Sequence, residues 1–337
     1  MDSVSQFALG AAVTAAVLGG RCPAGRAVLI GGLVATLPDL DVLIDHGDAV
    51  ANMTMHRAES HALLWLAAAT PLLAWLISRL RGQREHFGRW CLAVLLTLWT
   101  HVGLDALTIY GTQLALPFTD HPFGLGCIFV IDPLYTLPLL LGIGLLCWRR
   151  GDRSGVRANL VGLLLSTGYA AWSFGAQQHV VRLAREELAR QGIVAEQVLV
   201  TPAPLQTVLW RVVAVDAGAF YEGSHSLFDS GAHIAFERFD RGAALFAALR
   251  DDPVVARLAR FSHGMFRLRR VGDEVFMADL RMGQQPFFPF DFRVAGSHPD
   301  GALAALPPQR TAARLDVGVA ASWIWRRMWG EAVPPPR

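Results

Sequence analysis

Long apolar segments alternate with short polar loops through the first half of the chain. A helix needs about 20 apolar residues to cross the hydrocarbon core of a bilayer. The pattern predicts membrane helices at Val4–Gly20, Ala27–Ile44, Ala62–Leu80, Trp90–Ile109, Ile128–Trp148 and Leu160–Ala176. The first two segments are short and rich in glycine, which leaves open whether one of them is re-entrant or interfacial. We therefore expect a mainly α membrane protein with about five to six transmembrane helices in residues 1–176.

The arginines between these segments predict the orientation of the helices. They gather in the loops after the first, third and fifth segments, whereas residues 45–61 and 110–127 contain a single arginine, Arg57. Loops rich in arginine stay on the cytoplasmic side of the membrane. We therefore expect the N-terminus to lie outside, together with everything after about residue 176.

The pattern changes after about residue 176, where shorter alternating stretches begin. Residues 180–191 are amphipathic and continue the sixth helix, and Gly192 is a stop signal. Alternation of apolar and polar positions is typical of strands. The stretches that show it are Gln197–Thr201, Thr207–Val215, Met265–Val271, Glu274–Arg281 and Phe287–Val294. With helices predicted at 242–250 and 253–261, we expect a small extracytoplasmic α+β domain at 177–332, followed by a disordered proline-rich tail at 333–337.

The composition agrees with a membrane protein. Of the 337 residues, 53% are hydrophobic and 17% are charged, against roughly 25% charged in an average soluble domain. We expect the lipid bilayer as a partner and no nucleic acid. The four cysteines form no Cys-x-x-Cys pair, which counts against a zinc ribbon.

Six acidic and imidazole residues fall at the ends of three apolar segments. They come in pairs, which are Asp39 with Asp41, His56 with His61, and His101 with Asp105. The expected orientation brings all three pairs to the outer face at a similar depth. Because such side chains are costly at membrane depth, they are candidates for function. The sequence predicts that these six residues bind a divalent metal ion.

The spacing within the pairs supports this prediction. His101 and Asp105 are four positions apart on a helical segment, so they share one face. Asp39 and Asp41 repel each other unless a cation compensates their charges. Imidazole with carboxylate suits Zn²⁺, Mn²⁺ or Fe²⁺, and six ligands are enough for one or two ions. Each pair alone also has a structural explanation, as a turn, a satisfied histidine or an interhelical hydrogen bond, but together they favour a metal site.

The segment around His56 and His61 contains further candidates. These two histidines are five positions apart, which fits a loop ligand followed by a ligand at a helix start, with Ser60 as the N-cap. Arg57 could bind an anionic substrate group, as a bidentate arginine does. It could equally pair with Glu59 or with a lipid phosphate.

These motifs resemble those of a bacterial inner-membrane family described as metal-dependent hydrolases. The residues that carry the resemblance are Pro38 to Asp41, His56-Arg57 with Ser60-His61, and His101-x-x-x-Asp105-x-x-Thr108 through Gly111 and Pro117-Phe118. The similarity covers about residues 1–175. It implies an integral protein of the bacterial inner (plasma) membrane with a divalent-metal site, and it supplies no substrate.

The leading hypothesis from the sequence is a metal-dependent membrane hydrolase. The ion would activate a water molecule, with Asp39 or Asp41 as the base and Arg57 beside them. A site at the membrane edge favours a lipid-linked ester or phosphoester as the substrate. A metal-ion or proton transporter is one alternative, although the apolar inner halves of the segments count against a path through the membrane. A non-enzymatic adaptor or regulator is another.

Overall fold

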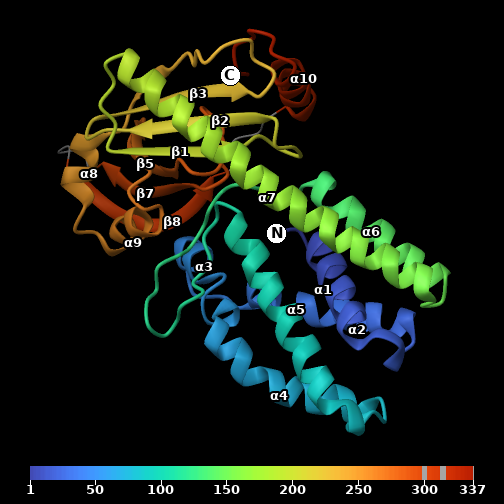
Figure 1. Cartoon of the computed structure of the whole chain (residues 1–337). Helices are drawn as coiled ribbons and strands as arrows, with labels where there is room; N and C mark the ends of the chain where they lie inside the picture. The colour runs from blue at the N-terminus through green and yellow to red at the C-terminus, as the bar shows by residue number, and fades with distance from the viewer. Residues whose placement is uncertain (298–301, 312–315, 337) are drawn as a thin grey trace. The chain divides into compact units, whose positions relative to one another are not determined.

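A computed structural model describes residues 1–297, 302–311 and 316–336 (Figure 1). The chain divides into two compact units. The helical unit comprises Met1–Leu43, Arg57–Phe174 and Pro204–Gln206. The C-terminal unit comprises Ile44–His56, Gly175–Ala203 and Thr207–Arg337.

The helical unit consists of helices joined by turns and, between α5 and α6, by a longer loop at 108–132. Its helices are α1 (Ser3–Leu18), α2 (Ala24–Thr36), α4 (Leu63–Leu80), α5 (Phe87–Leu107), α6 (Pro133–Trp148) and the first part of α7 (Arg153–Arg190). The 3₁₀ turns are η1 (Gly19–Arg21), η2 (Pro38–Leu43), η3 (Glu59–His61) and η4 (Arg84–His86). Aspartate side chains cap α1, α6 and α7, because Asp2, Asp132 and Asp152 accept backbone N–H groups at the starts of these helices.

Three helical stretches in the described part of the chain are long and apolar enough to cross a membrane. They are Ser3–Arg21, Leu63–Leu80 and Arg84–Leu107. The expectation of five to six spans was therefore too high. Helices α2 and α6 have only 13 and 16 residues, fewer than the roughly 20 that a span needs. Helix α7 contains the sixth predicted segment, but serine, threonine and glycine lower the apolar character of that segment.

Helices α1 and α2 pack closely through glycines. A Cβ atom added to Gly10 would lie 2.3 Å from Cβ of Ala35, and one added to Gly31 would lie 2.5 Å from the carbonyl oxygen of Gly10. Small residues allow two helix backbones to approach in this way. Helix α5 is tied to α1 by a 2.8 Å hydrogen bond between the hydroxyls of Thr14 and Thr97. This packing holds the turn that follows α2 in place relative to α5.

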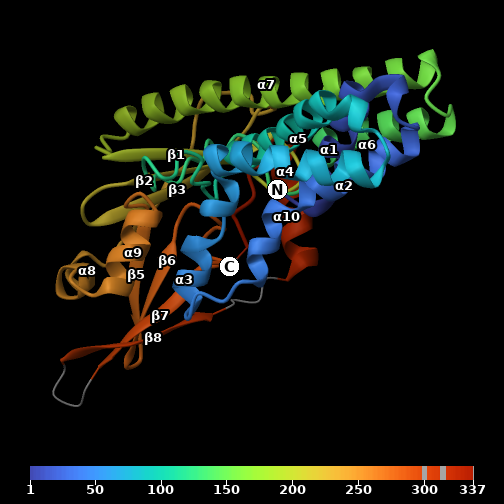
Figure 2. The same cartoon turned by 90° about the horizontal axis from the view of Figure 1, so that it is seen from below.

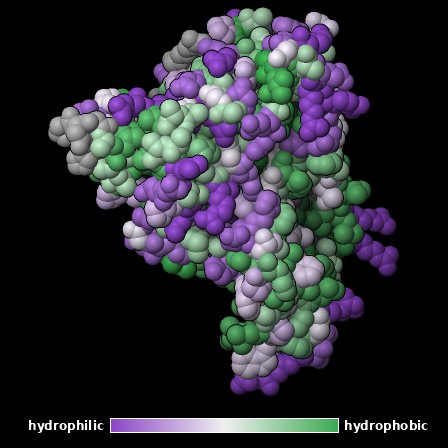
Figure 3. Space-filling model, turned by 90° about the vertical axis from the view of Figure 1, so that its left-hand side faces the viewer, coloured by the Kyte–Doolittle hydropathy of each residue, from purple (hydrophilic) through white to green (hydrophobic). Residues whose placement is uncertain are grey.

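The outward faces of these helices are apolar. Only 22% of the Leu63–Leu80 span is buried, and its exposed residues include Leu72, Trp75 and Leu80. In the face drawn in Figure 3, hydrophobic side chains cover much of the helices and hydrophilic ones gather at one end. An apolar surface of this extent is typical of contact with lipid.

The C-terminal unit contains two four-stranded antiparallel sheets, and in each of them neighbouring strands follow one another in the sequence (Figure 2). The first sheet is β1 (Gln197–Pro202), β2 (Leu209–Val215), β3 (Ala219–Ser226) and β4 (Glu237–Asp240). The second is β5 (Phe266–Val271), β6 (Glu274–Asp279), β7 (Asp291–Ser297) and β8 (Leu303–Thr311). The helices are α3 (Ala49–Met55), α8 (Ala243–Leu249), α9 (Pro253–Phe261), α10 (Val317–Met328) and the second part of α7. The core contains Trp210, Phe220 and Phe292.

The structure extends the sequence-based prediction of this unit. All five predicted strands are present with shifted ends, and the predicted helices correspond to α8 and α9. The β5–β6 hairpin turns at Gly272, which has a φ of 58°. Three strands, β3, β4 and β8, were not predicted, because they contain glycine, charged residues or proline in place of clear alternation. Arg337, the last residue of the predicted tail, lies outside the described residues.

Candidate metal centre

The last turns of α5 present a histidine and an aspartate on one buried face. His101 and Asp105 are four positions apart, and their exposed fractions are 1% and 0%. A carboxylate near a helix C-terminus meets the negative end of the helix dipole, which is unfavourable. The position of Asp105 therefore requires compensating positive charge from its surroundings.

Two short 3₁₀ turns, η2 and η3, carry other candidate metal ligands. Pro38 begins η2, the turn that carries Asp39 and Asp41. His61 is the last residue of η3, two positions before the first residue of α4. Both turns place side chains at helix ends, where backbone geometry departs from the helical pattern.

Four side chains converge on one point. One ligand atom each from Asp39, His61, His101 and Asp105 lies within 4.8 Å of the other three. Nε2 of His61 is 3.4 Å from Oδ1 of Asp39 and 3.3 Å from Oδ2 of Asp105. Nε2 of His101 is 3.6 Å and 3.4 Å from the same two oxygens. The two Nε2 atoms are 3.3 Å apart.

These distances suit a metal ion. Bonds of 2.0–2.1 Å in a tetrahedral zinc site place the ligand atoms about 3.3–3.4 Å from one another. Oδ2 of Asp105 is buried and has no hydrogen-bond partner in the part of the chain that the structure describes. An unsatisfied buried carboxylate oxygen is costly unless a cation lies beside it. This buried Asp/His/His/Asp group could therefore hold a metal ion.

Asp39 is the least buried member, since its side chain is 21% exposed. Burial raises the pKa of its carboxyl, but the neighbouring imidazoles of His101 and His61 outweigh this effect and hold the pKa below the ordinary value. Asp39 is therefore a carboxylate, the form that can bind a cation.

The other oxygen of Asp105 receives several donors. Oδ1 is 3.1 Å from the guanidinium of Arg57, accepts a 3.1 Å hydrogen bond from Nε2 of Gln6, and accepts another from the amino group of Met1. This leaves Oδ2 facing the two imidazoles. Gln6 was not among the sequence candidates, although a buried amide within the apolar helix α1 is a signal that could have identified it.

Arg57 is held by its backbone as well as by its side chain. Its φ is 64°, its N–H donates to Oδ2 of Asp41 at 2.9 Å, and its carbonyl accepts from the N–H of Gln113. The guanidinium also lies over the ring of Tyr110, 5.1 Å from the centroid. In the part of the chain that the structure describes, the ion-pair partner of this arginine is Asp105 and not Glu59.

Asp41 and His56 do not belong to the converging group. Oδ2 of Asp41 accepts a 2.6 Å hydrogen bond from Ser60 and lies 3.6 Å from Nδ1 of His61, on the opposite edge of that ring. His56 is the C-cap residue of α3 and belongs to the C-terminal unit. The expectation that Ser60 caps α4 was wrong, because Ala62 holds the N-cap position and makes no side-chain cap.

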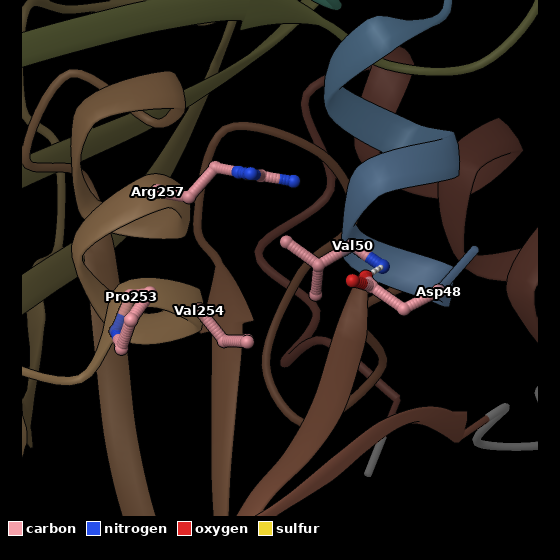
Figure 4. Close-up of a pocket in the computed structure, with 5 residues that line it drawn as sticks. All are labelled: Asp48, Val50, Pro253, Val254 and Arg257. Atoms are coloured by element: carbon pink, nitrogen blue, oxygen red, sulfur yellow. Dashed lines mark hydrogen bonds between the residues drawn. The ribbon is translucent and has the colours of Figure 1, made fainter. Parts of the chain in front are cut away.

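The C-terminal unit has a small pocket of its own. It measures about 130 Å³ and is lined by Asp48 and Val50 of the α3 region and by Pro253, Val254 and Arg257 of α9 (Figure 4). Its carboxylate, Asp48, caps α3 by accepting the N–H groups of Val50 and Ala51. None of the sequence candidates lines this pocket, and a single capping carboxylate does not make a metal site.

Comparison with known proteins places the helical unit in a family. Residues 1–178, more than half of the chain, match the family model of the YdjM inner membrane protein. The chain belongs to the YdjM inner membrane protein family. This membership confirms the resemblance noted in the sequence, and the four converging residues all lie within the segment that matches YdjM.

One curated relative covers most of the chain. The uncharacterized protein YfhP of Bacillus subtilis (strain 168) is 26% identical over 299 residues, which are 85% of this chain and 87% of the relative. No solved structure matches the chain. The YdjM family thus identifies an inner membrane protein, and the chemistry has to be argued from the site itself.

Proposed function

We propose that this protein is a metal-dependent hydrolase of the inner membrane, with Asp39, His61, His101 and Asp105 as the metal ligands. The observation that carries the proposal is the set of five contacts of 3.3–3.6 Å among the ligand atoms of these residues. The four residues come from three separate parts of the chain. Their convergence in a buried site is the arrangement that a bound cation requires.

One ion suits the site better than two. The four donor atoms surround one point, and Asp41 and His56 contribute nothing to that group. Two imidazoles with two carboxylates suit zinc, manganese or iron, and the near-tetrahedral spacing favours zinc. When bound, such an ion is a Lewis acid that activates water for attack on an ester or phosphoester.

The residues around the ligands have distinct roles in this proposal. Asp39 has the most exposed side chain of the four, so water reaches the site from its side and the free oxygen of its carboxylate orients that water. Arg57 pairs with Asp105 and so offsets part of the negative charge that the two aspartate ligands bring to the site, which lowers the repulsion toward an anionic substrate. Asp41 is not a metal ligand in this proposal, and it influences the site through its contacts with Ser60 and His61.

The position of the site at a helix end supports a lipid-linked substrate. His61 lies two residues before the span Leu63–Leu80, and Asp105 lies two residues before the end of the span Arg84–Leu107. Both residues therefore lie at one edge of the hydrocarbon core. An ester or phosphoester attached to a lipid would reach the same depth.

A structural metal ion is the second candidate function. Structural zinc sites are closed by four protein ligands, whereas catalytic sites keep a position for water. Four donors converge here, which favours a structural ion as long as Asp39 stays bound. Under this alternative the protein is an adaptor or regulator that the ion stabilises.

Elemental mass spectrometry combined with a hydrolysis screen tests the proposal. Purified wild type should contain about one zinc, manganese or iron ion per chain and should hydrolyse lipid esters or lipid phosphoesters. His101→Gln should lose both properties, whereas Asp45→Asn, a change at an exposed loop carboxylate, should keep them. An ion without hydrolysis would favour the structural alternative, and a metal-free wild type after reconstitution would exclude both.

We also propose that the C-terminal unit lies outside the cytoplasm. The arginine-rich loops support this orientation. In a variant without the four native cysteines, a membrane-impermeant maleimide should label Val194→Cys in intact cells. It should label Glu85→Cys, in the loop between α4 and α5, only after permeabilisation. The reverse pattern would place the C-terminal unit in the cytoplasm.

A further inference from the structure

The edge of the His61 ring that faces away from the converging ligands contacts a short chain of hydrogen-bonding groups. Nδ1 of His61 is 2.8 Å from Oγ of Ser60. The same Oγ is 2.6 Å from Oδ2 of Asp41, which also accepts the N–H of Arg57 at 2.9 Å. Ser60 thus lies between a carboxylate and an imidazole.

Only one direction of hydrogen bonding satisfies this chain. An ionised carboxylate only accepts, and a serine hydroxyl has a single proton to donate. The 2.6 Å contact with Asp41 therefore uses the proton of Ser60. The oxygen of Ser60 can then only accept from His61, so Nδ1 of the imidazole carries a proton.

We infer that Ser60, oriented by Asp41, is a positioning residue that fixes the Nδ1–H tautomer of His61 and directs the lone pair of Nε2 at the metal. This inference rests on the proposed function, since it assigns a role toward the same ion. Metal-binding histidines are commonly held by a second group on the other ring nitrogen, which sets the tautomer and the ring orientation. Ser60 and Asp41 thus share one function, although neither of them is a metal ligand.

The second histidine of the site provides a contrast. Nδ1 of His101 is buried and has no hydrogen-bond partner within the described residues. Its ring is held by its place on α5, four positions from Asp105. Of the two imidazoles, His61 is therefore the one whose tautomer depends on a neighbouring side chain.

Three substitutions in the full chain test the inference. Ser60→Ala removes the acceptor for Nδ1–H, and Asp41→Ala frees the proton of Ser60 to turn toward Nδ1, which favours the wrong tautomer. Each should weaken zinc binding about 10- to 100-fold, the usual effect of losing such a partner. Ser60→Thr keeps the hydroxyl and should bind zinc as wild type does. Thr100→Ala is the matched control, since that hydroxyl bonds carbonyls of its own helix, Leu96 and Thr97.

Two readouts separate the inference from the proposed function. Zinc affinity is measured by competition with a chelator, and the tautomer is read by ¹⁵N NMR of histidine-labelled, metal-free protein, with His61→Gln identifying the His61 signal. An Nδ1–H signal in wild type that changes in Ser60→Ala supports the inference. A wild-type His61 signal in which Nδ1 carries no proton, or full zinc affinity in Ser60→Ala, overturns it. Failure of wild type to bind any metal overturns the proposed function instead, and the NMR result of wild type stands whether or not the variants fold.

Discussion

Nε2 of His61 and Nε2 of His101 lie 3.3 Å apart, although the two residues are 40 positions apart in the sequence. Their ring centroids are 5.2 Å apart and the rings are inclined by 53°. Two imidazole nitrogens at this distance either share a proton or bind a common cation. The adjacent oxygens of Asp39 and Asp105 supply the negative charge that a cation needs.

The converging group predicts which of the sequence candidates are ligands. His61→Gln and Asp105→Asn should each abolish the bound metal, because each removes a donor atom from the group. His56→Gln should retain about one ion per chain, since His56 lies outside the group. Elemental analysis of the three purified variants checks this prediction. Loss of metal in His56→Gln would show that the ligand set is larger than the four residues.

Metal binding should stabilise the folded protein. A ligand that binds only the native state at 100 times its Kd contributes roughly 2.7 kcal/mol. Zinc should therefore raise the apparent Tm of wild type, and a chelator should lower it, in a thermal melt of detergent-solubilised protein. The His101→Gln variant should show no response to either treatment. An equal response of His101→Gln would mean that the ion acts elsewhere on the chain.

Removal of Arg57 should affect the metal-free protein more than the metal-loaded one. Loss of one partner of a buried ion pair costs roughly 3–5 kcal/mol, because the remaining charge is left uncompensated. A cation beside Asp105 would supply part of that compensation. In thermal melts, Arg57→Met should lower the apparent Tm more strongly with chelator than with zinc. Arg26→Met, at an exposed arginine, serves as the control and should change the apparent Tm little. If Arg57→Met lowered the apparent Tm equally with and without zinc, the charge of Arg57 would not be coupled to the ion.

The close approach of α1 and α2 should be sensitive to a single methyl group. In Gly31→Ala the new Cβ would lie 2.5 Å from the carbonyl oxygen of Gly10, so the helices must move apart. Overpacking of this kind costs roughly 1–3 kcal/mol. Because α2 leads into the turn that carries Asp39, zinc affinity should fall together with the apparent Tm. Gly25→Ala, where the new Cβ meets no atom within 4 Å, should leave both unchanged or slightly raise the apparent Tm, because alanine favours the helix more than glycine does. A similar loss there would mean that the effect of Gly31→Ala does not arise from the contact between α1 and α2.

The stability of the C-terminal unit should fall in mild acid because of His225. Burial lowers the pKa of this imidazole, Arg327 and His179 add to the effect, and Asp229 opposes it. Between the folded pKa and the unfolded value of about 6.5, the unfolded chain binds more protons, so stability falls as the pH drops through that window.

The His225→Gln variant should remove this part of the pH dependence. The measurement is the apparent Tm of the full chain between pH 7.5 and 5.5. The control is His121→Gln, at an exposed side chain of the helical unit, and it should follow the wild-type curve. Identical curves for wild type and His225→Gln would assign the acid sensitivity to other groups.

The sequence by itself determined the features that depend on local patterns. Apolar runs predicted the helices of the first half, alternation predicted five of the strands, and the spacing of His101 and Asp105 predicted a shared helical face. These predictions succeeded because helix and strand periodicities set side-chain directions over short distances. The same local patterns overestimated the number of spans, because length and apolar character are shared by membrane helices and by shorter packed ones.

Only the tertiary structure decided which candidates meet. Asp39 and Asp41 lie in one 3₁₀ turn, yet Asp39 faces the histidine pair and Asp41 faces Ser60. Side-chain directions in irregular segments follow backbone angles that long-range contacts impose and no periodicity encodes. The φ of 64° at Arg57, just before η3, is such an angle. For the same reason the contact of Gln6 with Asp105, which joins positions 99 residues apart, could not be predicted from the sequence.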